Sequence, residues 1–65
     1  MIVNFYKRIG VEWHRDHEYK LIASKNIECI PQKGTFIKLS GQLFTVDRIY
    51  FDMYTCEYNI YIIRA

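Results

Sequence analysis

Residues 35–51 read TFIKLSGQLFTVDRIYF, two runs of β-branched and aromatic residues separated by Ser40 and Gly41. Residues of these types favour strands because they pack well on a pleated surface. A two-residue connection that contains glycine is typical of a tight β-hairpin, since glycine adopts the positive φ that the turn requires. The sequence therefore predicts a hairpin with strands over residues 35–39 and 42–51.

Alternating apolar and polar residues extend the strand prediction to the rest of the chain. They indicate further strands over residues 1–8, 18–25 and 58–64. In the last of these, Tyr58, Ile60 and Ile62 share one face. Tyr61 and Ile63 lie on the other, so this strand is apolar on both sides.

The same alternation assigns faces in two other strands. Over residues 18–25 it places Tyr19, Leu21 and Ala23 together. Over residues 42–51 it places Ile49 with Leu43 and Phe51, and puts Tyr50 with Phe44 and Val46 on the opposite face.

Two segments do not follow the alternation. Residues 26–33 predict a connection whose Ile27 and Ile30 reach the core, because Pro31 favours extended geometry before it and donates no ladder hydrogen bond. Residues 11–17 are compatible with a strand, a short helix or a loop.

The chain has 65 residues and a mass of 7.9 kDa, so residues 1–65 form a single small domain. A flat sheet of this size would leave an apolar face in water. We therefore expect an all-β fold, a small five-stranded SH3-like or OB-like half-open barrel built as an antiparallel meander.

Charge and composition argue against several classes of protein. The formal net charge is +2 and the charges are scattered, whereas a dedicated nucleic-acid binder presents a clustered basic face. No segment has the length of a signal peptide core or a membrane span, which predicts a cytoplasmic protein without a membrane partner. Cys29 and Cys56 are then expected to be reduced thiols.

No set of residues suggests an enzyme or a metal site. His14 and His17 are three apart, but a zinc site needs three or four converging ligands, and each cysteine stands alone. Gly34 and Gly41 lack the spacing of a phosphate loop. We expect no catalytic residue, no metal and no cofactor.

Aromatic residues exceed what a minimal core requires, at 17% of the chain. Tyrosine and phenylalanine are enriched at protein interfaces, and strands that are apolar on both faces need cover on both. The sequence thus predicts a homodimer that also binds another protein. The candidate residues for the partner-binding or dimer interface are Tyr50, Tyr54, Tyr58, Tyr61 and Ile63.

Two alternatives remain open. In a nucleic-acid-binding small β-barrel, exposed tyrosines would stack on bases and basic side chains would contact phosphates. The candidate contacts are Lys33, Lys38, Arg48 and Arg64. A small-molecule-binding sponge, with its site between subunits, is the third reading.

Residues 30–49 also carry a family resemblance. They contain Pro31 and Gly34 in a Pro-x-x-Gly pattern, a short strand, a turn with Gly41, and Phe44 two residues before Val46. This pattern resembles small SH3-like barrels encoded by phages and prophages, a group that includes inhibitors of bacterial anti-phage defence. The resemblance implies a non-enzymatic accessory protein that binds and inhibits a host protein, such as a defence complex, in the cytoplasm of an infected bacterium.

Overall fold

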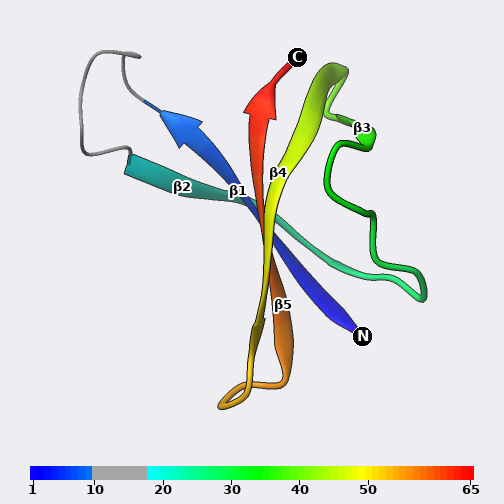
Figure 1. Ribbon diagram of the computed structural model, residues 1–65, viewed down its shortest axis with the longest axis vertical. Helices are drawn as coiled ribbons and strands as arrows, with labels where there is room; N and C mark the ends of the chain where they lie inside the picture. The colour runs from blue at the N-terminus through cyan, green and yellow to red at the C-terminus, as the bar shows by residue number, and fades with distance from the viewer. Residues whose placement is uncertain (10–17) are drawn as a thin grey trace.

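The computed structural model describes residues 1–9 and 18–65, which form five strands (Figure 1). The strands are β1 (Ile2–Ile9), β2 (Glu18–Asn26), β3 (Phe36–Leu39), β4 (Gln42–Asp52) and β5 (Glu57–Arg64). Every strand end lies within one residue of its predicted position. The prediction for residues 11–17 falls outside the described residues. Across the described part of the chain, no helix is long and apolar enough to cross a membrane.

The strands form one sheet in the order β2-β1-β5-β4-β3. Three of the four pairings are antiparallel, and β1 and β5 pair in parallel. The order therefore departs from a continuous meander at this one junction. Val3 and Phe5 of β1 lie opposite Tyr58 and Ile60 of β5. The apolar residues of the first and last strands therefore lie side by side on one face of the sheet.

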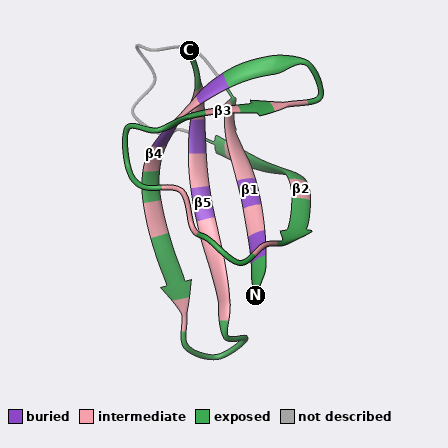
Figure 2. Ribbon diagram, turned by 90° about the vertical axis from the view of Figure 1, so that its right-hand side faces the viewer, coloured by how far each residue is buried: buried purple, intermediate pink, exposed green. Residues whose placement is uncertain are grey.

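The sheet is strongly twisted and curls around its own apolar face, as Figure 2 shows from the side. The prediction of an all-β half-open barrel is thereby confirmed. The long β4–β5 hairpin runs beyond the rest of the sheet at one end (Figure 1). Within the described residues, β2 and β3 are the two edges of the sheet.

The core is small and comes from three strands. The buried residues of the described chain are Val3, Phe5, Phe44, Val46, Ile60 and Ile62. They account for the purple segments of β1, β4 and β5 in Figure 2. Ile27 and Ile30 from the connection between β2 and β3 pack against them, as predicted.

The face assignment in β2 was wrong because the β1–β2 ladder contains a bulge. The register shifts between Phe5 and Tyr6, which lie opposite Ala23 and Leu21. A bulge inserts one extra residue and reverses the alternation beyond it. Ala23 therefore packs against the core, while Leu21 lies on the outer face with Tyr6.

The predicted face assignment in β4 was also wrong, because the β4–β5 ladder contains a second bulge. Val46 pairs with Ile62 and Arg48 pairs with Tyr61, which leaves Asp47 as the extra residue. Beyond it, Ile49 shares the core face with Val46 instead of lying opposite to it. Tyr50 is turned to the outer face, where its ring lies beside that of Tyr61.

The predicted hairpin between β3 and β4 is present. Leu39 pairs with Gln42, and Ser40 and Gly41 between them have φ angles of 51° and 79°. Two consecutive positive φ angles define the type I′ turn, whose twist matches that of the strands it joins.

Candidate binding face

Four tyrosines from four strands meet on the outer face of the sheet, away from the core. This tyrosine cluster consists of Tyr6 of β1, Tyr19 of β2, Tyr50 of β4 and Tyr61 of β5. Tyr61 is at its centre: its ring centroid lies 5.3 Å from that of Tyr6, 4.7 Å from that of Tyr19 and 5.4 Å from that of Tyr50. The Tyr6 ring is stacked on Tyr61 and the other two meet it edge-on, geometries that the ring quadrupoles favour.

Strand register and the two bulges explain why these rings converge. Tyr6 lies directly opposite Tyr61 in the parallel β1–β5 pair. The bulge at Asp47 turns Tyr50 to the outer face, and the bulge in the β1–β2 ladder does the same for Tyr19. Without the bulges, strict alternation would direct Tyr50 and Tyr19 to the other side.

Arg48 lies at the edge of the tyrosine cluster, opposite Tyr61 in the β4–β5 ladder. Its Nη1 donates to Tyr50 Oη at 3.4 Å, its Nη2 to Tyr19 Oη at 3.3 Å, and its Nε to Asp47 Oδ2 at 3.4 Å. The hydrogen bond to Tyr50, followed by that to Asp47, raises the pKa of Arg48 above its ordinary value. The guanidinium is charged throughout the physiological pH range, as arginine already is with its ordinary pKa.

These side chains enclose a shallow hollow of about 290 Å³, lined by Tyr19, Arg48, Tyr50 and Tyr61. Its walls are aromatic rings, and its lining side chains carry three tyrosine hydroxyls and one guanidinium, of which the hydroxyls of Tyr19 and Tyr50 accept from Arg48. The chemistry of this lining is suited to an apolar group that carries hydrogen-bond acceptors.

A polar strip of amide and hydroxyl groups, with one carboxylate, continues the outer face beyond the cluster. Asn4 Nδ2 donates to Asn59 Oδ1 at 3.1 Å and to Glu57 Oε1 at 2.9 Å, and Ser24 Oγ donates to Asn4 Oδ1 at 2.6 Å. Because these groups satisfy one another, the strip presents little free charge except that of Glu57.

A second hollow, of about 250 Å³, lies on the core side of the sheet between β1, β2 and the β3–β4 turn. Its lining includes Lys7 and Phe44, and Lys7 Nζ lies 5.8 Å from the centroid of the Phe44 ring. The ammonium is therefore already placed against an aromatic face of its own chain.

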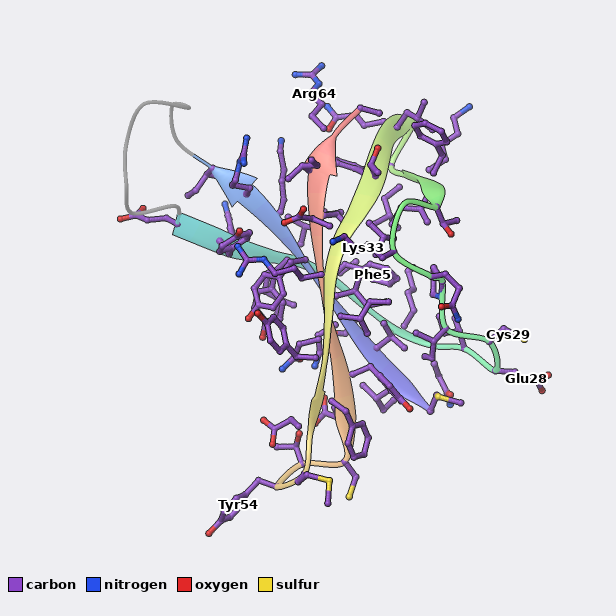
Figure 3. The ribbon with its side chains drawn as sticks, viewed as in Figure 1. Phe5, Glu28, Cys29, Lys33, Tyr54 and Arg64 are labelled. Carbon is purple, nitrogen blue, oxygen red and sulfur yellow. The ribbon has the colours of Figure 1, made fainter. Side chains whose placement is uncertain are left out.

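The structure brings together two of the five residues predicted for the interface. Tyr50 and Tyr61 belong to the tyrosine cluster. Tyr54 is fully exposed at the β4–β5 turn, at the far tip of the hairpin in Figure 3. Tyr58 is on the core side with its ring 4.8 Å from that of Phe51, and Ile63 lies further along β5, opposite Thr45.

The sequence did not identify Tyr6 and Tyr19 as part of the site. Alternation along the first strand predicts which face Tyr6 occupies. It predicts contact with Tyr61 only once β1 is known to pair with β5. The position of Tyr19 on the outer face depends on the bulge in the β1–β2 ladder, and no local sequence pattern predicts that bulge.

The four basic residues proposed as phosphate contacts are distributed over the fold. Arg48 lines the tyrosine hollow and Lys38 is on β3. Lys33 lies in the connection before β3, and Arg64 ends β5, as Figure 3 shows for both. Across residues 1–9 and 18–65, no group of three or more His, Cys, Asp and Glu side chains is placed to hold a metal ion. Cys29 and Cys56 are free and exposed.

Comparison with known protein families, curated proteins and solved structures gives no match for this chain. The fold and the candidate site together define a small all-β half-barrel with a tyrosine-lined outer face.

Proposed function

We propose that this chain is a non-enzymatic protein-binding factor that inhibits a host protein by covering part of its surface with the tyrosine cluster. The observation that carries the proposal is the mutual packing of four tyrosine rings on the face away from the core. Rings that are already ordered lose little conformational freedom on binding, and tyrosine is enriched among residues that dominate interface energy.

The partner that we propose is a bacterial anti-phage defence complex. Support comes from the resemblance of residues 30–49 to phage-encoded SH3-like barrels, together with the half-barrel fold that the resemblance implies. Inhibition by covering a surface needs a stable patch with a few anchors and no catalytic group.

A phage-challenge assay tests this function with a matched pair of variants. Bacterial strains that each carry one defence system are made to express the chain, and plaque formation is measured. The wild type should restore plaques in at least one strain. Tyr50→Ala should lower the effect at least tenfold, because Tyr50 is a half-exposed member of the cluster, whereas Tyr54→Ala at the hairpin tip should retain it.

Both variants must first show the wild-type circular dichroism spectrum and remain folded at the temperature of the assay. Failure of the wild type to restore plaques in any strain would argue against an anti-defence role. Equal losses for Tyr50→Ala and Tyr54→Ala would argue against the tyrosine cluster as the contact surface.

The second partner that we propose is another copy of the chain, joined at the edge strand β2. Leu21 and Ile22 of this strand are exposed. If two β2 strands pair antiparallel about a two-fold axis, Leu21 of each copy can lie opposite Ile22 of the other. In that register Glu18 also lies opposite Lys25, and a cross-strand pair of opposite charges favours the arrangement.

Nucleic-acid binding is the rival function. Arg48 among tyrosine rings resembles the stacking platforms of single-strand binders, but those proteins also present a basic groove that follows the backbone. A fluorescent single-stranded oligonucleotide distinguishes the two proposals. We expect no binding at physiological salt; tight binding that weakens steeply as salt rises would favour the rival.

A further inference from the structure

The hollow in the tyrosine cluster offers several hydrogen-bond donors, namely the Arg48 guanidinium and the hydroxyls of Tyr19, Tyr50 and Tyr61, and its acceptors are neutral hydroxyl oxygens. Arg48 donates to the hydroxyl oxygens of Tyr19 and Tyr50, so the hydroxyl protons of both tyrosines are directed elsewhere and remain available to a ligand. Arg48 has five N–H groups, and the three contacts described above are long, between 3.3 and 3.4 Å. A stronger acceptor can replace them at little cost, because charged hydrogen bonds prefer shorter distances.

The local charge is suited to a single anion. Arg48 lines the hollow, and Arg8 lies opposite Tyr19 in the β1–β2 ladder. Asp47 offsets one of these two cations and is already in contact with Arg48 Nε. Among the residues that the structure describes here, one positive charge therefore remains, beside the aromatic walls formed by Tyr50 and Tyr61.

The volume indicates the size of the group that can be seated within the hollow. A hollow of about 290 Å³ is at the lower end of ligand pockets, which start near roughly 300 Å³, so it accommodates one side chain or a group of similar size. Its ring walls favour an apolar body next to the charged group.

From these donors, this charge and this volume, we infer that the hollow binds a carboxylate carried on an apolar body, supplied by a protein partner as a chain end or an acidic side chain beside an apolar one. Arg48 and the hydroxyls of Tyr19 and Tyr50 hold the carboxylate oxygens, and the rings pack against the apolar part. This inference rests on the proposed protein-binding function and specifies the chemistry that the partner must present.

A phosphate within a nucleic acid fits the surroundings less well. A polynucleotide needs successive cations along its path. Next to the cluster, the outer face instead carries Asn4 and Asn59, with Glu57 held by Asn4. A strand leaving the hollow in this direction would meet neutral groups and a carboxylate.

The test uses small probes on the isolated chain. N-acetyl-phenylalanine carries a carboxylate and an aromatic ring, and its amide has the same shape without the charge. Binding is followed by NMR through the ring protons of the tyrosine cluster and the Nε proton of Arg48. We expect N-acetyl-phenylalanine to bind in the millimolar range and its amide at least tenfold more weakly.

Matched variants locate the site. Arg48→Gln should weaken binding of N-acetyl-phenylalanine at least tenfold, whereas Arg64→Gln, which removes an exposed cation at the end of β5, should leave it unchanged. Tyr50→Phe retains the ring but removes one donor, so it should weaken the acid more than the amide.

Equal binding of acid and amide, or full binding by Arg48→Gln, would overturn the inference. Thymidine 5′-monophosphate that binds more tightly than N-acetyl-phenylalanine would also overturn it, in favour of nucleotides. These probes need no cellular partner, so the result is independent of the phage-challenge assay. Discrimination between acid and amide would support the carboxylate site even if no strain responded to the chain.

Discussion

Ile60 is fully buried in the middle of the sheet, opposite Phe5 on one side and Ile49 on the other. We expect Ile60→Val to lower the free energy of unfolding by about 1 kcal/mol and Ile60→Ala by about 3 kcal/mol, through lost burial and the cavity left behind. A domain of this size has only about 3–10 kcal/mol in total, so the alanine variant should be close to unfolding.

Urea denaturation followed by circular dichroism measures both effects. Ile2→Val is the control, because Ile2 is 40% exposed and its shortening should change the unfolding free energy by less than about 0.5 kcal/mol. A similar loss for Ile60→Val and Ile2→Val would contradict the placement of Ile60 in the core.

Tyr61 supports the tyrosine cluster through its ring, which contacts three other tyrosine rings. Tyr61→Phe retains these contacts and should change the unfolding free energy by less than about 0.5 kcal/mol. Tyr61→Ala removes all three and should cost about 2 kcal/mol, since each aromatic pair contributes about 0.5–1.5 kcal/mol beyond its buried area. Urea denaturation of the two variants provides the comparison, and equal costs would show that the rings do not stabilise one another.

At the scale of elements, the β3–β4 turn admits a stabilising substitution. Ser40 has a φ of 51°, in the left-handed region where asparagine is better tolerated than serine, and Gly41 follows with a φ of 79°. Ser40→Asn creates the Asn-Gly pair that type I′ turns prefer and should raise the unfolding free energy by about 0.5 kcal/mol. Thermal denaturation measures the change.

Gly41→Ala is the opposing control for this turn. No neighbouring atom lies within 4 Å of an added methyl group, so only the backbone conformation opposes it. We expect a loss of about 1 kcal/mol. If the alanine variant were as stable as the wild type, the positive φ at Gly41 would be in doubt.

The sequence was sufficient to predict the strands and this hairpin because both depend on local signals. Strand bounds followed from alternation, and the turn followed from Ser40 and Gly41. The bulges left no such signal: Asp47 is a polar residue in an alternating strand, and only its pairing with β5 reveals it as the extra residue. One extra residue reverses every face assignment beyond it.

At the scale of the whole molecule, the candidate site depends on contacts between segments far apart in the chain. Tyr50 and Tyr61 could be identified from composition and strand position. Their neighbours Tyr6 and Tyr19 could not, because the parallel pairing of β1 with β5 is a non-local contact that local patterns do not encode.

The proposed homodimer predicts the mass of the protein in solution and the effect of a charge on edge strand β2. Light scattering at micromolar concentration should give a mass close to twice 7.9 kDa. Leu21→Lys should shift the protein toward a monomer, because it places two charges in the proposed β2–β2 contact. Leu43→Lys is the matched control, since Leu43 is also 49% exposed but lies on β4, which has partners on both sides.

A wild type that is monomeric by light scattering would contradict the proposed homodimer. A monomer produced equally by Leu21→Lys and Leu43→Lys would place the contact elsewhere. Neither result would bear on the carboxylate site, which lies within one copy of the chain.

The parallel pairing of β1 with β5 also has a consequence for synthesis on the ribosome. β1 emerges first, but its neighbour in the sheet is the last of the five strands to be made. Until Ile60 and Ile62 have left the exit tunnel, Val3 and Phe5 can pack only against β2 and the residues that follow it, and not against β5. The apolar face of β1 therefore lacks its β5 neighbour while the intervening strands are made, so the core is completed only after β5 is free.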